Sequence, residues 1–409
     1  MANITILQQP DAITPAYNDN VWVVSGTNTA QANFKFICDV IVNGQSFRQA
    51  VFPDPTHSRG IFNVGRVVEN YISDTLNTNV GFQENVGSII QYSVQFGEEY
   101  GLASSGTTIY PNQVSSSKYV WNGIIDFLPY QSYDYTDYVM NTTDVVNFLT
   151  NAPSSGVIST DENAWLYGMV ESSGVVYHAR INTYDSSDNL LQTVKVNNPY
   201  QSIGSDNSQF VRFGSGTRNL NLIESSGITD GGSQPIITNS VTKYYVVFQT
   251  YAGVEVSNRF YYKVEDPCTK NNTYRLHFLN KLGGFDSFTF IRADRKTATI
   301  DRKEYKKRVT GMTSDSTWGY STSAHNRVNF DTTLDEVIAA QSDWISEATN
   351  DWLYELVTSP VVYLDDPTYG LVGVNIVNTA YDFKTEAVDK LFNLTIQFKY
   401  SFQTYRQRR

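Results

Sequence analysis

Alternation of apolar and polar residues with a period of two dominates the chain, and this is the pattern of half-buried strands. Residues 33–44 place five apolar side chains on one strand face and end in Asn43-Gly44, which predicts a hairpin turn. The remaining segments with strand-like patterns are 89–96, 175–181, 190–196, 244–248, 276–290, 361–364, 371–377 and 391–402. The chain is therefore predicted to be mainly β.

Two of these segments resemble each other. Residues 92–96 and residues 244–248 share the sequence Tyr-x-Val-x-Phe, and each is followed five residues later by a glycine. We read this as a degenerate internal duplication that yields tandem antiparallel β-sandwich (Ig-like) domains. The polar segment 150–163 is the best linker candidate. The expected domains are 1–150, 151–267 and an α+β C-terminal section at 268–409.

Helical spacing occurs at two places. Val64, Val67, Val68, Tyr71 and Ile72 predict a short helix inserted in the first domain, with Asn63 as its cap. In the C-terminal section, Thr333-Leu-Asp-Glu336 reads as a capping box. The apolar residues behind it predict one long helix at about 333–357, which Pro360 ends.

Composition argues against an enzyme. The chain has 28 Tyr and 22 Phe but is only 17% charged, and its 4 His and 2 Cys are scattered. No metal-ligand spacing occurs, so we expect no metal, no cofactor and no catalytic residue. Cys38 and Cys268 could form one disulfide, although two buried thiols are favoured. We find no signal peptide and no apolar run long enough to span a membrane.

The net charge of −11 is unevenly distributed. Eight basic residues lie between Arg292 and Arg308, where three acidic residues offset them, and three arginines lie near residue 409. The basic stretch could be a solvated loop, a contact with a charge-complementary subunit, or a nucleic-acid contact, for which it has few interleaved aromatics. The candidate assembly contacts are Arg292, Arg295, Lys296, Arg302, Lys303, Lys306, Lys307, Arg308, Arg406, Arg408 and Arg409.

Three segments together carry a resemblance. They are Phe52-Pro-Asp-Pro with residues 62–71, residues 274–290, and residues 352–363. The combination resembles β-rich virion proteins of tailed bacteriophages, especially neck, tail and baseplate proteins of phages that infect Bacteroidetes, including the crAss-like group. The resemblance carries over no functional residue.

The resemblance implies a structural virion protein that is a subunit of a symmetric ring in the tail or neck (collar). The expected partners are further copies of the chain, in six- or twelve-fold rings, and other virion proteins. Assembly would take place in the host cytoplasm, with no membrane and no sequence-specific nucleic acid involved.

Two other functions compete with the ring subunit. One is a receptor- or carbohydrate-binding module of a tail tip or baseplate, with Trp121, Trp165 and Trp318 as candidate stacking residues. The other is a hydrolytic tail enzyme, which would need two carboxylates facing each other across a cleft.

Overall fold

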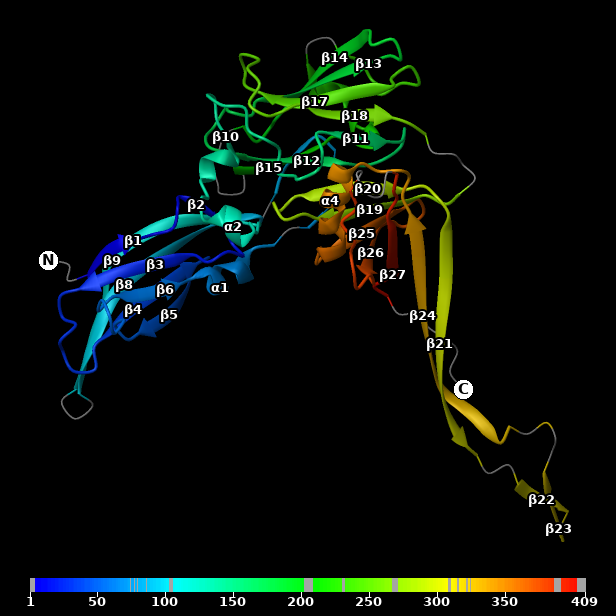
Figure 1. Cartoon of the computed structure of the whole chain (residues 1–409), viewed down its shortest axis with the longest axis horizontal. Coiled ribbons are helices and arrows are strands. Elements are labelled where there is room, and N and C mark those ends of the chain that lie inside the picture. The colour runs from blue at the N-terminus through cyan, green and yellow to red at the C-terminus, as the bar shows by residue number, and fades with distance from the viewer. Residues whose placement is uncertain are drawn as a thin grey trace. The chain divides into compact units, whose positions relative to one another are not determined.

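The computed structural model is mainly β and divides into two compact units (Figure 1). Unit 1 comprises Met1–Asp266 and Leu279–Ser287, and unit 2 comprises Pro267–Phe278 and Phe288–Arg409. The structure describes residues 4–402 except 74, 77, 79, 86, 103–105, 202–208, 230–231, 267–270, 308–309, 315, 321–322, 324 and 386–390. Each unit is described by itself.

The first half of unit 1 has two sheets. One is ordered β2-β9-β8-β4-β5 and the other β1-β3-β6. Their strands are β1 (Ile4–Gln8), β2 (Ile13–Pro15), β3 (Val21–Gly26), β4 (Lys35–Val42), β5 (Gln45–Val51), β6 (Gly60–Asn63), β8 (Ile89–Leu102) and β9 (Gly106–Trp121). Both sheets contribute to one hydrophobic core, in which Trp22 and Phe62 from the smaller sheet pack with Phe96 from the larger.

The second half of unit 1 again has two sheets. They are ordered β11-β18-β17-β13-β14-β16 and β10-β12-β15-β7. Their strands are β7 (Phe82–Glu84), β10 (Val139–Met140), β11 (Ser155–Ile158), β12 (Trp165–Val170), β13 (His178–Tyr184), β14 (Leu190–Asn197), β15 (Phe210–Gly214), β16 (Ile228–Thr229), β17 (Lys243–Gln249) and β18 (Phe260–Val264). A second core lies here, centred on Phe82, Phe213 and Phe248.

The two halves follow the same strand order. The sheet β2-β9-β8-β4-β5 corresponds in sequence order to β11-β18-β17-β13-β14. In both, the first pair is parallel and the others are antiparallel. The two Tyr-x-Val-x-Phe segments lie on the matching strands β8 and β17, and the Tyr, Val and Phe side chains of both are buried. The repeated pattern therefore marks the central core-facing strand of each half.

One strand crosses between the halves. β7 follows the first half's helix α1 (Gly65–Val68) in sequence, yet it pairs with β15 of the second half. The expected linker is also structured, because β11 within it pairs in parallel with β18. A polar composition marked this segment as a linker, but a short edge strand needs few apolar residues.

Local turn and cap chemistry explains two other elements. Asn43 and Gly44 have φ values of 47° and 76°, so they form the predicted two-residue turn between β4 and β5. The helix expected at 64–72 is shorter, since α1 ends at Val68, and its N-cap residue is Val64 rather than Asn63. The Asn63 side chain still accepts the backbone N–H of Gly65 at 3.1 Å. Among the described residues of unit 1, the other helices are α2 (Phe127–Tyr130), α3 (Thr217–Asn221) and the 3-10 turns Glu69–Tyr71, Tyr135–Asp137 and Ser225–Gly227.

Unit 2 is built on a sheet ordered β20-β19-β25-β26-β27-β24-β21. Its strands are β19 (Tyr274–Leu279), β20 (Phe285–Phe290), β21 (Asp294–Lys306), β24 (Arg327–Gln341), β25 (Val362–Asp366), β26 (Gly370–Ile376) and β27 (Thr395–Tyr400). The last residue of β19 and the first three of β20 fall in the segment Leu279–Ser287 that is grouped with unit 1. Between β21 and β24 lies a small hairpin of β22 (Thr310–Ser314) and β23 (Thr317–Tyr320). Helix α4 (Glu347–Thr358) packs Trp352 against Phe278 of β19.

The long helix expected at 333–357 is wrong in its first half. Residues 333–341 belong to β24, and Thr333 pairs with Asp301 of β21 rather than capping a helix. The helix begins at Glu347, where the Ser346 side chain accepts the backbone N–H of Thr349 at 3.2 Å. Leu334 and Ile338 are four residues apart, a spacing that fits one helix face and one strand face equally well.

Candidate functional site

The basic stretch is a strand and not a loop. Residues 294–306 form β21, which pairs with β24 from Asp294↔Ala340 to Lys306↔Arg327. Figure 1 shows these two strands as a long ribbon that continues past the other strands of unit 2. Arg292 precedes β21 and Lys307 follows it, while Arg308, Arg406, Arg408 and Arg409 lie outside the described residues.

Strand geometry divides the basic side chains between two faces. Successive residues of a strand point to opposite sides, so Arg295 and Lys303 lie on one face of the ribbon, and Lys296 and Arg302 on the other. The structure therefore does not gather the basic stretch into one patch.

Acidic residues of β24 also offset the charge of β21. The two strands together carry six basic and six acidic side chains, namely Arg295, Lys296, Arg302, Lys303, Lys306 and Arg327 against Asp294, Asp301, Glu304, Asp331, Asp335 and Glu336. Two cross-strand ion pairs form, Lys296–Glu336 at 2.7 Å and Lys303–Asp331 at 3.3 Å. Such exposed pairs stabilise by about 0–1 kcal/mol. The two strands of the ribbon therefore carry no net charge, whereas Arg292, Lys307 and Arg308 of the basic stretch lie outside them.

Arg292 stands apart from the ribbon's pairs. Its Nε lies 3.0 Å from Oδ1 of Asp343, and its guanidinium forms an ion pair with that carboxylate. Burial acts to raise the pKa of Asp343, but hydrogen bonds from Arg292 and from the Trp344 backbone outweigh it and lower the pKa. Arg292 is therefore already committed to a partner within unit 2.

Large apolar side chains accompany the charges on the ribbon and its end hairpin. Ile300, Tyr305, Phe330 and Trp318 are all exposed, with Trp318 at 60%. The rings of Tyr305 and Phe330 meet edge to face at 6.1 Å. The ribbon therefore offers solvent a mixed surface of charge and aromatic area.

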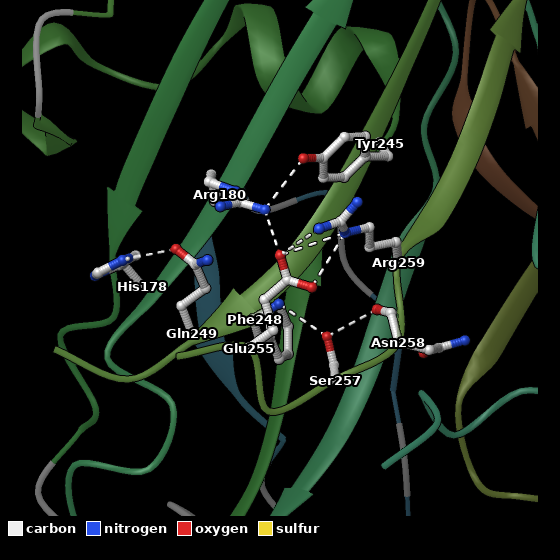
Figure 2. A network of polar contacts seen from close by, with 9 residues as sticks. All are labelled: His178, Arg180, Tyr245, Phe248, Gln249, Glu255, Ser257, Asn258 and Arg259. Carbon is white, nitrogen blue, oxygen red and sulfur yellow. Dashed lines mark hydrogen bonds and ion pairs between the residues drawn. The ribbon is translucent and has the colours of Figure 1, made fainter. Parts of the chain in front are cut away.

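A second constellation is a polar network on the outer face of β13 and β17 (Figure 2). Glu255 accepts hydrogen bonds from Arg259 at 2.9 and 3.1 Å and also pairs with Arg180. Arg180 in turn donates to the Tyr245 hydroxyl at 3.1 Å. Both guanidinium groups lie over the Tyr245 ring, 5.7 Å (Arg180) and 5.1 Å (Arg259) from its centroid.

The electrostatics of this network favour a structural role. Burial acts to raise the pKa of Glu255, but Arg259 and Arg180 outweigh it and hold the pKa below its ordinary range. A carboxylate kept ionised between two arginines is a poor general acid or base. The neighbouring pair His178–Gln249 is buried within the same sheet. Through Glu255 and Arg180, the network fixes the turn at 249–260 to β13.

The third feature is a cavity of about 480 Å³ in the first half of unit 1. One wall comes from the chain around β2, with Tyr17, Asp11 and Asp19, and the other from the segment around α2, with Phe127 and Gln131. Phe127 is 75% and Tyr17 45% exposed. Sequence patterns do not predict this cavity, and a local signal near it is the density of aromatic residues at 127–138.

Hydrogen bonds fix the two walls of the cavity to each other. Asn18 exchanges two 2.8 Å bonds with the backbone of Ile125. Tyr130 donates to the Asp19 carbonyl at 2.8 Å, and Tyr133 donates to the Ile13 carbonyl at 2.9 Å. Burial and the nearby Asp19 and Asp11 raise the pKa of Tyr130 to about 12. The hydroxyl therefore stays protonated at neutral pH and remains a hydrogen-bond donor. The cavity is therefore pre-formed by contacts between residues far apart in sequence.

The tryptophans proposed for stacking differ in accessibility. Trp121 and Trp165 are buried in unit 1, so neither can stack on a ligand, while Trp318 is exposed on β23. Cys38 is a buried free thiol, whereas Cys268 lies outside the described residues. Within those residues, no group of three or more His, Cys, Asp or Glu could hold a metal ion. Nor does that part contain a helix long and apolar enough to cross a membrane.

Comparison with known proteins gives little. No protein-family model matches the chain, and no curated protein matches it. Among solved structures, the full extracellular region of plexin A4 aligns with a TM-score of 0.16 and 8% identity. That alignment covers 97% of this chain and 34% of the other, so the chain spans about a third of that protein's length. A similarity this weak supports no argument about fold or function.

Proposed function

We propose that this protein is a structural virion protein, a subunit of a symmetric ring in the tail or neck of a tailed bacteriophage. In this proposal unit 1 consists of two Ig-like β-sandwiches related by duplication. The matching strand orders β2-β9-β8-β4-β5 and β11-β18-β17-β13-β14 support the duplication. Tandem sandwiches would act as rigid scaffolds for the loops and strands that contact neighbouring subunits.

The observation that carries the proposal is the ribbon of β21 and β24. The next strand, β27, pairs with β24 only at Ile338–Gln341. Further along, no strand of the described part pairs with either outer edge of the ribbon. A two-stranded ribbon is at best marginally stable in water, and open edges accept strands from other chains. A neighbouring subunit that covers the ribbon would remove both problems.

Unit 1 contains an open edge of the same kind. In the second half, the outer edge of β15 is covered by β7. The matching strand in the first half is β6, whose outer edge has no paired strand in the described residues. The pairing of β7 with β15 thus shows, within the chain, an open sheet edge covered by a strand that comes from the other half of unit 1.

The basic residues retain a role in this proposal, but a narrower one. Arg295, Arg302, Lys306 and Lys307 form no ion pair within the described part of the chain, unlike Arg292, Lys296 and Lys303. In a closed ring each subunit meets the next through unlike surfaces, so these charges can face acidic surface on a neighbour. Screening over about 8–10 Å at physiological salt limits them to steering the encounter. Buried aromatic side chains would hold the contact.

Charge reversal tests the contact. We expect the triple change Arg295→Glu, Arg302→Glu and Lys306→Glu to impair assembly without lowering the melting temperature of the monomer. Lys303 is left intact because its reversal would place two carboxylates opposite each other at Asp331. The control is Arg66→Glu, Lys243→Glu and Lys263→Glu, which changes the net charge equally in unit 1 and is the harsher change, because each of these residues also loses an ion pair with a carboxylate. Equal assembly of both triple variants would contradict the proposed contact.

A receptor- or carbohydrate-binding module is the second candidate. Burial of Trp121 and Trp165 removes two of the three side chains that first suggested it. The exposed rings of Tyr17 and Phe127 at the cavity of unit 1 favour it instead.

A further inference from the structure

The cavity of unit 1 has the size and the pre-formed walls of a ligand-binding site. Its volume of about 480 Å³ lies within the range of about 300–1,000 Å³ usual for small-molecule sites. The hydrogen bonds of Asn18, Tyr130 and Tyr133 hold its walls together before any ligand arrives. A pre-formed site does not have to be ordered at the moment of binding, which favours affinity.

The exposed groups at the cavity divide into two kinds. Tyr17 and Phe127 are aromatic side chains that both line the cavity and are exposed, and exposed apolar area that gathers at one place is typical of a binding site. Asp11 and Asp19 are exposed carboxylates, and one oxygen of Asp19 already accepts from the Asn63 amide. The exposed amides of Gln8 and Gln131 can both donate and accept hydrogen bonds, although Gln131 already donates once to the Phe127 carbonyl. None of the described residues that line the cavity is basic.

These groups select the chemistry of the ligand. A ligand that satisfies them has apolar C–H faces for the rings, and both donors and acceptors for the amides and carboxylates. A cation would use the carboxylates and rings but would gain no hydrogen bond from the amide donors. An anion would be repelled by the two aspartates. A neutral, hydroxyl-rich molecule meets every requirement.

We propose that the cavity between the β2 region and α2 binds a neutral saccharide, with Phe127 and Tyr17 stacking on its sugar rings and Asp11 accepting hydrogen bonds from its hydroxyls. The site binds and does not cleave. A glycosidase places its acid in a desolvated environment, whereas both aspartates here are exposed.

Binding can be measured on the purified full-length chain whatever its oligomeric state, so this proposal and the ring proposal fail independently. The probes are neutral oligosaccharides of glucose, galactose, mannose and N-acetylglucosamine, with oligogalacturonate as the anionic probe and arginine ethyl ester as the cationic one. Saturation-transfer NMR detects binding, and titration gives the dissociation constant.

We expect at least one neutral oligosaccharide to bind and the anionic probe not to bind. Phe127→Ala and Tyr17→Ala should each weaken binding about tenfold, the loss of one stacking contact. The matched control is Leu128→Ala, since Leu128 is 78% exposed beside Phe127 but does not line the cavity. The proposal is overturned if no neutral probe binds, if arginine ethyl ester binds in preference, or if the two ring variants bind as the control does.

Discussion

Replacing Glu255 by glutamine removes the negative charge shared by Arg180 and Arg259 while keeping the shape of the side chain. The side chains of Glu255 and Arg180 are 25% and 21% exposed, so the pair is mostly buried. Loss of a fully buried partner costs about 3–5 kcal/mol, and an exposed pair contributes about 0–1 kcal/mol. A value between these limits, about 2 kcal/mol, is expected for Glu255→Gln.

Thermal unfolding followed by circular dichroism measures this loss. For a body of this size, about 2 kcal/mol should lower the melting temperature by roughly 4 °C. The matched control is Glu265→Gln, because Glu265 pairs with Lys263 on the same sheet but both side chains are about half exposed or more, at 48% and 65%. That variant should lose less than about 1 kcal/mol.

The pH dependence checks the cause. The two arginines outweigh burial and lower the pKa of Glu255 in the folded state. The stability from its charge is therefore complete above the unfolded pKa of about 4.3 and is lost as the pH falls through the folded pKa. The difference in melting temperature between the wild type and Glu255→Gln should therefore become smaller below about pH 4.3. The reasoning would be refuted if Glu255→Gln lowered the melting temperature no more than Glu265→Gln does, or if its effect did not change with pH.

Two further outcomes follow from the packing of unit 1. Gly283 has a φ of 77° and a Cβ there would lie 1.6 Å from the Asn122 carbonyl oxygen, so Gly283→Ala should cost about 3 kcal/mol or more in urea unfolding. Gly44→Ala, with a φ of 76° and open space, should cost only about 1–2 kcal/mol, and equal losses would contradict the clash. Burial, and to a smaller extent the charge of Asp39, raises the pKa of Cys38 to about 12. Iodoacetamide at about pH 8 should therefore alkylate Cys38 only after the protein unfolds. Mass spectrometry of the Cys38 peptide checks this, and rapid alkylation of the native protein would contradict it.

Local pattern was sufficient for several strands, among them β4, β8 and β13, but it missed others such as β9, β12 and β21. The alternation at 89–96 marks β8, because a strand buried on one face repeats every two residues. Residues 244–248 are apolar throughout, which fits β17 because both of its faces are buried. The turn at Asn43-Gly44 was equally predictable, since few residues adopt a positive φ at both turn positions.

Features that depend on distant segments could not be predicted from local pattern. The helix expected at 333–341 failed because pairing with β21 overrides a spacing that fits either structure. The basic stretch seemed strongly charged because its neutralising partners, Asp331, Asp335 and Glu336, lie on the opposite strand. The cavity joins Tyr17 to Phe127 across more than a hundred residues, and no local motif records that meeting.

The central claim, that the chain is a subunit of a ring, is tested most directly by the mass of the purified protein. Light scattering over a range of concentrations gives the number of subunits, and negative-stain class averages give the symmetry. The account predicts a closed oligomer with cyclic symmetry that persists on dilution. A protein with the 46.1 kDa mass of one chain at every concentration and salt condition would contradict it.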